Sequence, residues 1–307
     1  MRFNSLGTIL AALSVLTPTH AINIISSNDD GWAEANIRAL FQSLAAVGHS
    51  VVVSAPAENQ SATGSSQKAP TKLTEPCEFN SCPAGSPAVG YNASQPRLNY
   101  VNSYPVTAMK HGISHRSPQL FGGAPPDLAV AGPNVGYNIG LEVFFSGTVG
   151  AATYAAHDAG IPAIAFSGST GSQTAWNASS SLPHYSDVYA ALATNLSDHL
   201  IATGKPYLPS DVWLNVNFPS VSASQCSSPE DVAFVLSRIH IAIPLITPDD
   251  VTTCGTSRLP SELAVSVASG CYASVSVGVA STKEDANSTV QAVVLKKLSN
   301  ILTCLPS

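Results

Sequence analysis

Short apolar runs rich in β-branched residues alternate along this chain with stretches that have one apolar face. Residues 22–26 form the first run, residues 33–47 carry apolar side chains at helical spacing, and residues 50–54 form the second run. A buried parallel strand is typically continuous and apolar, whereas a surface helix repeats its apolar positions about every 3.6 residues. The same patterns predict strands at 127–131, 161–167, 212–219 and 272–281, and helices at 107–115, 146–158 and 288–302.

This alternation predicts an α/β fold with a mainly parallel sheet. The first strand–helix–strand unit has no G-x-G-x-x-G turn, which argues against a dinucleotide site. The 307 residues allow one large domain or two small ones. We predict a single domain over residues 22–307, with a core at about 22–220 and a β-rich extension at about 221–307.

Polar side chains gather where the predicted strands end. Two aspartates, Asp29 and Asp30, follow the first strand, and a loop rich in Ser and Asn follows the second. In open α/β sheets, ligands bind at the carboxyl ends of the strands, so we expect these loops to converge on one site. The polar groups in the loops are Asp29, Asp30, Glu58, Asn59, Ser61, Asn134, Asn138, Ser146, Gly147 and Thr148.

The oxygen atoms of these side chains suit a hard divalent cation. Carboxylate, hydroxyl and amide oxygens favour Mg²⁺, Mn²⁺ or Ca²⁺, whereas Zn²⁺ favours His and Cys. Ser146-Gly147-Thr148 opens a predicted helix, where free N–H groups and the helix dipole favour a phosphate. A metal beside a phosphate site points to hydrolysis of phosphoesters. Taken alone, N-D-D-G is commonly a turn and S-G-T a helix cap; their order along the chain favours a shared site.

Five stretches resemble, in chain order, the SurE (survival protein E) family of metal-dependent nucleotidases and phosphatases. They are NIISSNDDGW, VVVSAPAENQSATGSS, PPDLAVAGPNVGYNIGLEVFFSGTVGAATYAA, GIPAIAFSG and LNVNFP, between about residues 22 and 219. The resemblance implies a Rossmann-like three-layer αβα core, a divalent metal, and release of phosphate from phosphomonoesters, with nucleoside monophosphates the best-known substrates. It also implies a homodimer or higher homo-oligomer, often built with an extended C-terminal segment.

The resemblance further implies a role for each matching residue. The metal ligands would be Asp29, Asp30, Ser61 and Asn134. The phosphate-binding residues would be Ser146, Gly147 and Thr148, with Asn138 as a further site residue. Asp29 and Asp30 are the expected catalytic residues, with Asp29 as the nucleophile or as the base for the attacking water.

Two positions depart from the family pattern. Gln60 stands before the loop serine, where the family usually has a basic residue, and Thr107 stands where the family has an aspartate. These departures concern the choice of substrate more than the metal chemistry.

Residues 1–21 have the pattern of a secretory signal peptide. Arg2 supplies a positive charge, residues 7–16 are apolar, and Thr19-His20-Ala21 offers small residues at the −3 and −1 positions of a cleavage site. A first core helix is the alternative, against which Pro18 argues. We therefore expect a secreted, extracellular protein, which with the resemblance suggests a fungal-type member with an acid-phosphatase role.

Cysteines and glycosylation motifs agree with export. The chain has six cysteines, which in an oxidising compartment are expected to pair as disulfides. Their pairing is open, although Cys77 and Cys82 are near enough for a local bridge and the other four could join the C-terminal third. Candidate N-glycosylation sites are Asn59, Asn92, Asn177, Asn195 and Asn287.

Charge and hydropathy argue against nucleic-acid and membrane partners. The net charge of −6 argues against nucleic acid, which needs a basic face. No segment beyond residue 21 has the ~18 apolar residues of a membrane span, so no membrane is expected. The expected substrate is a small phosphate monoester.

Two other functions are compatible with parts of the sequence. Residues 110–118 (KHGISHRSP) resemble the R-H-G-x-R-x-P motif of histidine acid phosphatases, with Lys110 for the first arginine and one extra residue before Arg116. This stretch lies in a predicted helix, so His111 is expected to be an ordinary surface or capping residue. The second alternative is a secreted binding protein of the same family without activity.

Overall fold

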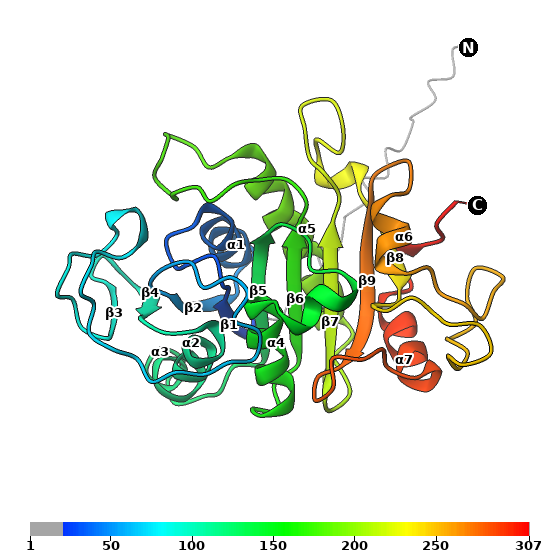
Figure 1. Cartoon of the computed structure of the whole chain (residues 1–307), viewed down its shortest axis with the longest axis horizontal. Helices are drawn as coiled ribbons and strands as arrows, with labels where there is room; N and C mark the ends of the chain where they lie inside the picture. The colour runs from blue at the N-terminus through cyan, green and yellow to red at the C-terminus, as the bar shows by residue number, and fades with distance from the viewer. Residues whose placement is uncertain (1–20, 307) are drawn as a thin grey trace, which may run out of the picture.

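The computed structural model describes residues 21–306, so the predicted signal peptide lies almost wholly outside the described residues. Its centre is one ten-stranded sheet with the order β10-β8-β9-β7-β6-β5-β1-β2-β4-β3 (Figure 1). The strands are β1 (Asn23–Ser27), β2 (Ser50–Pro56), β3 (Val89–Asn92), β4 (Gln95–Val101), β5 (Leu128–Val135), β6 (Ala163–Gly168), β7 (Val212–Phe218), β8 (Ala233–Ser237), β9 (Tyr272–Val279) and β10 (Leu302–Thr303).

The sheet is mainly parallel. Strands β1, β2, β4, β5, β6 and β7 pair in parallel, and the antiparallel pairs within residues 21–306 are β3–β4 and β7–β9. Strand β1 lies between β2 and β5, with Ile24 opposite both Val51 and Leu128. These central strands have apolar, β-branched middles and are buried almost throughout, because both of their faces are covered. The predicted α/β class is confirmed.

Helices cover both faces of the sheet and make three layers (Figure 1). Helix α1 packs against α5 on one face, and α2 packs against α4 on the other. Each face has its own apolar core, which explains why α4 buries so many alanines and glycines close to the sheet. The helices are α1 (Ala35–Ala46), α2 (Pro105–His111), α3 (Ser117–Leu120), α4 (Gly147–His157), α5 (His184–Ala202), α6 (Glu262–Ser266) and α7 (Ser288–Leu298).

The C-terminal part continues the same sheet. Strand β9 pairs antiparallel with β7, β8 pairs with β9, and β10 closes the edge. Three disulfides are present: Cys77–Cys82, Cys226–Cys271 and Cys254–Cys304. The last two join segments 45 and 50 residues apart within this part of the chain. All six cysteines are therefore paired.

Several element boundaries differ from the sequence prediction. The helix expected at 107–115 begins at Pro105 and continues as a π-helical turn from Gly112 to Arg116. Strand β5 extends to Val135, so Asn134 lies in a strand end rather than in a loop; β5 and β6 change register between Ala131 and Asn134. Helix α5 was not predicted from the sequence pattern. Among residues 21–306, no helix is both long and apolar enough to cross a membrane.

Candidate active site

The turn after β1 places two carboxylates side by side in the interior. Asn28 closes this turn from within, because its side-chain amide donates to the Gly31 carbonyl at 2.9 Å and its Oδ1 accepts the Gly31 N–H at 3.2 Å. Gly31 has φ of +116°, a conformation that favours glycine. Asp29 is 3% exposed and Asp30 is 1% exposed. The polar signal read from the sequence is thus a buried turn at the carboxyl end of β1.

Two groups at the start of α4 donate hydrogen bonds to the Asp29 carboxylate. The Thr148 hydroxyl donates to Oδ1 at 2.5 Å, and the Gly147 N–H donates to Oδ2 at 3.0 Å. Burial raises the pKa of Asp29, and these hydrogen bonds oppose that rise. A Cβ added to Gly147 would lie 2.9 Å from Asp29 Cβ, so the close approach requires glycine there.

Asp30 points to the neighbouring strand end. Its Oδ2 accepts the Val135 N–H at 2.9 Å, and its Oδ1 accepts a hydrogen bond from the Gln173 side chain. Burial, followed by the charge of Asp29, raises the pKa of Asp30 to about 7. Two adjacent buried carboxylates repel each other, so this pair is an environment that a cation would stabilise.

The loop after β2 lies directly against this pair. The Gln60 N–H donates to the Asp29 carbonyl at 2.7 Å, and the Thr63 hydroxyl oxygen lies 2.9 Å from the position of a Cβ on Gly147. Ser61 sits between these two contacts. Its backbone N–H donates to Asn59 Oδ1 at 2.8 Å, and its side chain is exposed. The structure therefore brings the Ser61 loop to the aspartates, with the serine on the open side.

Asn134 directly precedes Val135, whose backbone N–H binds Asp30. Its amide nitrogen donates to the Gly136 carbonyl at 2.9 Å. Its Oδ1 accepts no hydrogen bond from any residue between 21 and 306, although the residue is 9% exposed. An amide whose nitrogen is bound and whose oxygen is free presents that oxygen as an acceptor or as a metal ligand.

Asn138 belongs to a different set of contacts. Its side-chain amide donates to Ser167 Oγ at 2.9 Å, and its N–H donates to Asn217 Oδ1 at 2.9 Å. Its carbonyl accepts from Asn215 and Asn217. This buried amide network joins the ends of β6 and β7 to the loop after β5, and no hydrogen bond among residues 21–306 links it to the aspartate pair.

The predicted phosphate-binding residues open α4 as expected. Ser146 is its N-cap, and Ser146 Oγ accepts the Val149 N–H at 3.1 Å. The Gly147 N–H and the Thr148 hydroxyl donate to Asp29. The positive end of the helix dipole thus faces a carboxylate. A role for these residues in phosphate binding stays a prediction.

The set of donors fits a hard divalent cation. Asp29 and Asp30 supply carboxylate oxygens that each carry one hydrogen bond, which leaves a lone pair for a metal. Asn134 offers a free amide oxygen, and Ser61 an exposed hydroxyl. Oxygen ligands with two carboxylates are the chemistry of Mg²⁺, Mn²⁺ or Ca²⁺ sites.

Further ionisable groups lie behind the pair. Burial, followed by the charge of Asp30, raises the pKa of Glu34 well above its usual range. Burial also raises the pKa of Glu78 to about 8. The Arg38 guanidinium lies 5.0 Å from the ring centre of Trp32 and 4.9 Å from that of Trp176. Sequence reasoning singled out none of these residues.

The sequence analysis also missed Gln173, which touches Asp30 directly. Gln173 lies in a Ser-, Thr- and Gly-rich loop after β6. The rule that polar residues after parallel strands converge would have included this loop. Glu78, in contrast, lies far along the sequence from the end of any predicted strand, and no local pattern marked it.

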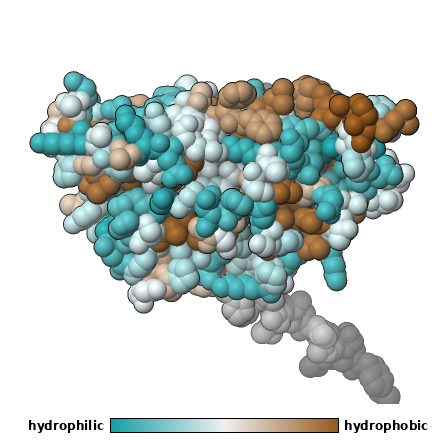
Figure 2. Space-filling view, turned by 60° about the horizontal axis from the view of Figure 1, so that its bottom comes forward, coloured by the Kyte–Doolittle hydropathy of each residue, from teal (hydrophilic) through white to brown (hydrophobic). Residues whose placement is uncertain are grey.

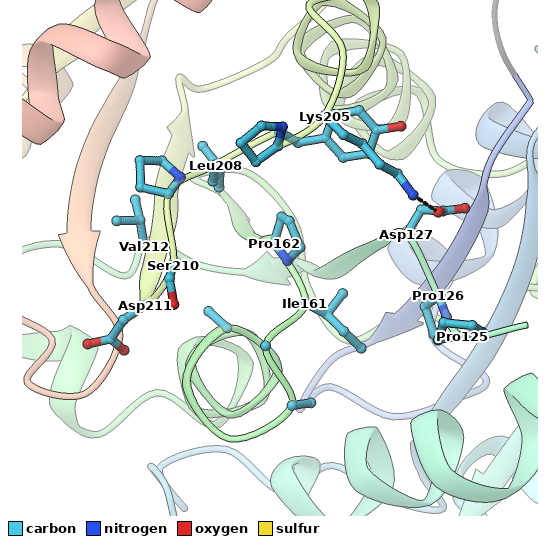
Figure 3. Close-up of a pocket in the computed structure, with 16 residues that line it drawn as sticks. Pro125, Pro126, Asp127, Ile161, Pro162, Lys205, Leu208, Ser210, Asp211 and Val212 are labelled. Atoms are coloured by element: carbon cyan, nitrogen blue, oxygen red, sulfur yellow. Dashed lines mark hydrogen bonds and ion pairs between the residues drawn. The ribbon is translucent and has the colours of Figure 1, made fainter.

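Two other features of the molecule lie apart from these contacts. A pocket of about 660 Å³ opens at the amino ends of β5, β6 and β7, where Lys205 pairs with Asp127 (Figure 3). Ligand sites of open α/β sheets lie at the opposite ends of the strands. His111 stacks on His115 with 4.8 Å between ring centres, and the Arg116 Nε donates to Asn99 at 2.6 Å. The helix predicted around His111 is confirmed.

The parallel sheet and the paired aspartates at a helix start define an α/β protein with an acidic site at its strand ends. A family model, Survival protein SurE, matches residues 24–238, and the chain belongs to the SurE family. The resemblance read from the sequence is confirmed.

Individual relatives agree. The chain is 35% identical over 280 residues to an acid phosphatase of Yarrowia lipolytica, covering 83% of this chain and 78% of that protein. It is 29% identical over 201 residues to a 5'-nucleotidase SurE of Lawsonia intracellularis, covering 66% and 67%. In fold, it is similar to the crystal structure of the SurE protein from Aquifex aeolicus, with a TM-score of 0.57 and 21% identity over 89% of this chain and 98% of that one.

Proposed function

We propose that this chain is a secreted, divalent-metal-dependent phosphomonoesterase that hydrolyses nucleoside monophosphates or other phosphate monoesters. The observation that carries the proposal is the pair Asp29 and Asp30, buried side by side at the carboxyl end of β1 with a helix start against Asp29. The similarity to an acid phosphatase and to 5'-nucleotidases of the SurE family supports this activity.

Four side chains are proposed to hold the metal: Asp29, Asp30, Ser61 and Asn134. Mg²⁺ and Mn²⁺ are the expected ions, with Ca²⁺ as an alternative. When bound, the metal supplies Lewis-acid stabilisation of the phosphate charge. The buried carboxylate pair supports the assignment, because its pKa values are raised and a cation would favour the ionised forms.

Residues at the start of α4 and Asp29 would orient the phosphate and the attacking water. Ser146, Gly147 and Thr148 form the start of α4; the Gly147 N–H and the Thr148 hydroxyl hold Asp29, and the helix dipole would attract the phosphate oxygens. Asp29 accepts the proton of the attacking water, or it attacks phosphorus itself and water then cleaves the resulting acyl phosphate to regenerate the carboxylate. The ester P–O bond breaks, water supplies the oxygen of the released phosphate, and the leaving alkoxide takes up a proton.

A substrate panel tests this function. Nucleoside monophosphates and p-nitrophenyl phosphate are assayed from acidic to neutral pH, with EDTA and with added Mg²⁺ or Mn²⁺. We expect hydrolysis that EDTA abolishes and metal restores. Activity that resists EDTA would favour the histidine acid phosphatase, and metal binding without hydrolysis would favour a non-catalytic binding protein. Asp29→Asn with full activity and a normal metal response would refute the site.

Secretion is the second part of the proposal. The three disulfides support it, because such bonds persist in oxidising compartments. We expect the protein in the culture medium, beginning at Ile22 and carrying N-glycans. N-terminal sequencing checks the cleavage site, and an intracellular product with residues 1–21 intact would refute it.

A homodimer is the third part, and an exposed apolar face supports it. The face combines the turn before α4, a loop after β8 and helix α6 (Figure 2). These segments adjoin, since Phe144 stacks on His240 at 5.6 Å and the Gly140 N–H donates to Glu262. Its side chains, 37 to 105% exposed, are Leu141, Phe144, Phe145, Ile241, Ile243, Leu245, Ile246, Leu263 and Val267.

The size and charge of this apolar face suit a second copy of the chain. Its side chains expose on the order of 1,000 Å², above the ~800 Å² that each partner buries in a standard interface. Residues 140–146, 239–247 and 262–267, which carry this face, contain no lysine or arginine, so they lack the basic residues that attract anionic lipid. Glu142 is the exposed charge among these residues, so two chains of net charge −6 can meet here with little like-charge repulsion.

Light scattering after gel filtration tests the dimer. We expect a dimer for the wild type and a monomer for Leu245→Asp/Ile246→Asp, while Val47→Asp at the end of α1 stays dimeric. A wild-type monomer at micromolar concentration would refute the proposal. So would a monomer that co-sediments with phosphatidylcholine vesicles, which would assign the face to a membrane.

A further inference from the structure

The loop closed by the Cys77–Cys82 disulfide, residues 77–82, lies on the outer side of the aspartate turn. The Glu78 Oε1 accepts the Ala33 N–H at 2.9 Å. The Ser81 Oγ accepts a hydrogen bond from Trp32 Nε1, also at 2.9 Å. This loop therefore binds the two residues that directly follow Gly31 in the aspartate turn.

The Glu78 side chain also packs against the outer side of the turn. A Cβ added to Gly31 would lie 2.1 Å from Glu78 Oε1, so the carboxylate rests against the Gly31 backbone. Asn28 closes the same turn from the inner side through two hydrogen bonds to Gly31. The turn that carries Asp29 and Asp30 is thus fixed from both sides, once by its own Asn28 and once by Glu78.

The disulfide loop contains two consecutive non-glycine residues in the left-handed backbone conformation. Phe79 and Asn80 both have left-handed backbone angles, with φ of +52° and +55°. Neither residue is glycine, so this conformation costs free energy that the surroundings must offset. The loop is closed by the bridge and by a hydrogen bond from the Cys77 N–H to the Cys82 carbonyl at 3.0 Å. The Glu78 N–H further binds the Ala57 carbonyl at 3.1 Å, which ties the loop to the end of β2.

We propose that Glu78, presented by the Cys77–Cys82 loop, is a positioning residue that fixes the Asp29–Asp30 turn in its metal-binding conformation. The inference rests on the proposed function and adds a dependence of the site on one particular disulfide. Reduction of this bridge would release Glu78 from the turn. The other two bridges lie in the C-terminal part and make no contact with the turn among the described residues.

The test compares amide hydrogen exchange with Mn²⁺ binding by calorimetry. In Glu78→Ala, we expect the Ala33 amide to exchange about 10-fold faster, and Mn²⁺ affinity and kcat to fall by about 10- to 100-fold. Glu78→Gln keeps an acceptor for the Ala33 N–H and should recover most of both. Glu75→Ala, an exposed glutamate of the same segment, should match the wild type.

The bridges are compared in the same way. Cys77→Ser/Cys82→Ser should resemble Glu78→Ala, whereas Cys254→Ser/Cys304→Ser should lower the melting temperature without changing Mn²⁺ affinity. A Glu78→Ala variant with wild-type exchange at Ala33 and wild-type Mn²⁺ affinity would overturn the inference, even if the cysteine variants fail to fold. A wild type that neither binds Mn²⁺ nor hydrolyses phosphomonoesters would overturn the proposed function instead, and the exchange comparison would still decide whether Glu78 fixes the turn.

Discussion

The Thr148 hydroxyl donates a 2.5 Å hydrogen bond to Asp29 Oδ1 and also accepts the Asp29 N–H at 3.2 Å, although the residues are 119 positions apart. This double contact joins the end of β1 to the first turn of α4. It fixes both the backbone and the carboxylate of Asp29. The orientation of the proposed catalytic carboxylate therefore depends on a residue outside its own turn.

Thr148→Val should lower kcat by about 10- to 100-fold, because the substitution keeps the shape and removes the hydrogen bond that orients Asp29. Thr153→Val is the matched control. Thr153 lies on the same helix and is buried, but its hydroxyl binds only the Val149 and Gly150 carbonyls. Steady-state kinetics on p-nitrophenyl phosphate, with melting curves for both variants, makes the comparison. Equal losses in the two variants would show a general effect on α4.

Asn134→Ala should weaken Mn²⁺ binding by about 10-fold, since it removes the free amide oxygen proposed as a ligand. The substitution also removes the amide nitrogen that donates to the Gly136 carbonyl, so stability is measured alongside. Asn195→Ala, an exposed amide on α5, serves as the control. Calorimetric titration with Mn²⁺ gives the affinities. Unchanged affinity in a folded Asn134→Ala variant would remove Asn134 from the ligand set.

The core of the fold and part of the site were predictable because both depend on local signals. Short β-branched runs such as residues 50–54 favour strands covered on both faces, and polar residues at the carboxyl ends of parallel strands meet at one edge of the sheet. The resemblance to the SurE family then assigned roles to Asp29 and Ser61. Helix α5 was not predicted because its buried face is interrupted by Ser186, Thr194 and Ser197.

The remaining contacts depend on tertiary structure. Glu78 reaches Ala33 across 45 positions, and nothing around it in the sequence marks it as a partner of the aspartate turn. Gln173 likewise reaches Asp30 across 143 positions. The hydrogen bonds from Gly147 and Thr148 to Asp29 could not be read from the S-G-T motif, which is also an ordinary helix cap.

Asn59 should carry no glycan in the active protein, although it lies in a glycosylation motif. Its Oδ1 accepts the Ser61 N–H at 2.8 Å, and the neighbouring Gln60 binds Asp29. A glycan there would crowd the open side of the proposed metal site. Peptide mapping should find Asn59 unmodified, with Asn177 and Asn195, both exposed, as the comparison sites. High occupancy at Asn59 in active protein would contradict the placement of Ser61 at the metal.

Because of Lys283, the stability of the folded protein depends on pH in the alkaline range. Burial lowers the pKa of Lys283 from 10.5 to about 8 in the folded state, and its ammonium group donates to the Val143 carbonyl at 3.1 Å. Between about pH 8 and pH 10.5 the unfolded chain binds more protons at this site than the folded chain, so the contribution of Lys283 to stability rises with pH across that window. Below about pH 8 the buried Lys283 is charged in the folded protein, and the free energy of unfolding is lowered by the full cost of burying that charge.

Lys283→Met should therefore stabilise the protein at pH 7 by about 2 kcal/mol, and this gain should shrink toward zero as the pH rises to about 10. Urea unfolding of both proteins at several pH values gives the difference in the free energy of unfolding. Lys110→Met, which replaces an exposed lysine on α2, should show no such trend. A difference for Lys283→Met that stays constant from pH 7 to pH 10 would show that its effect comes from packing alone.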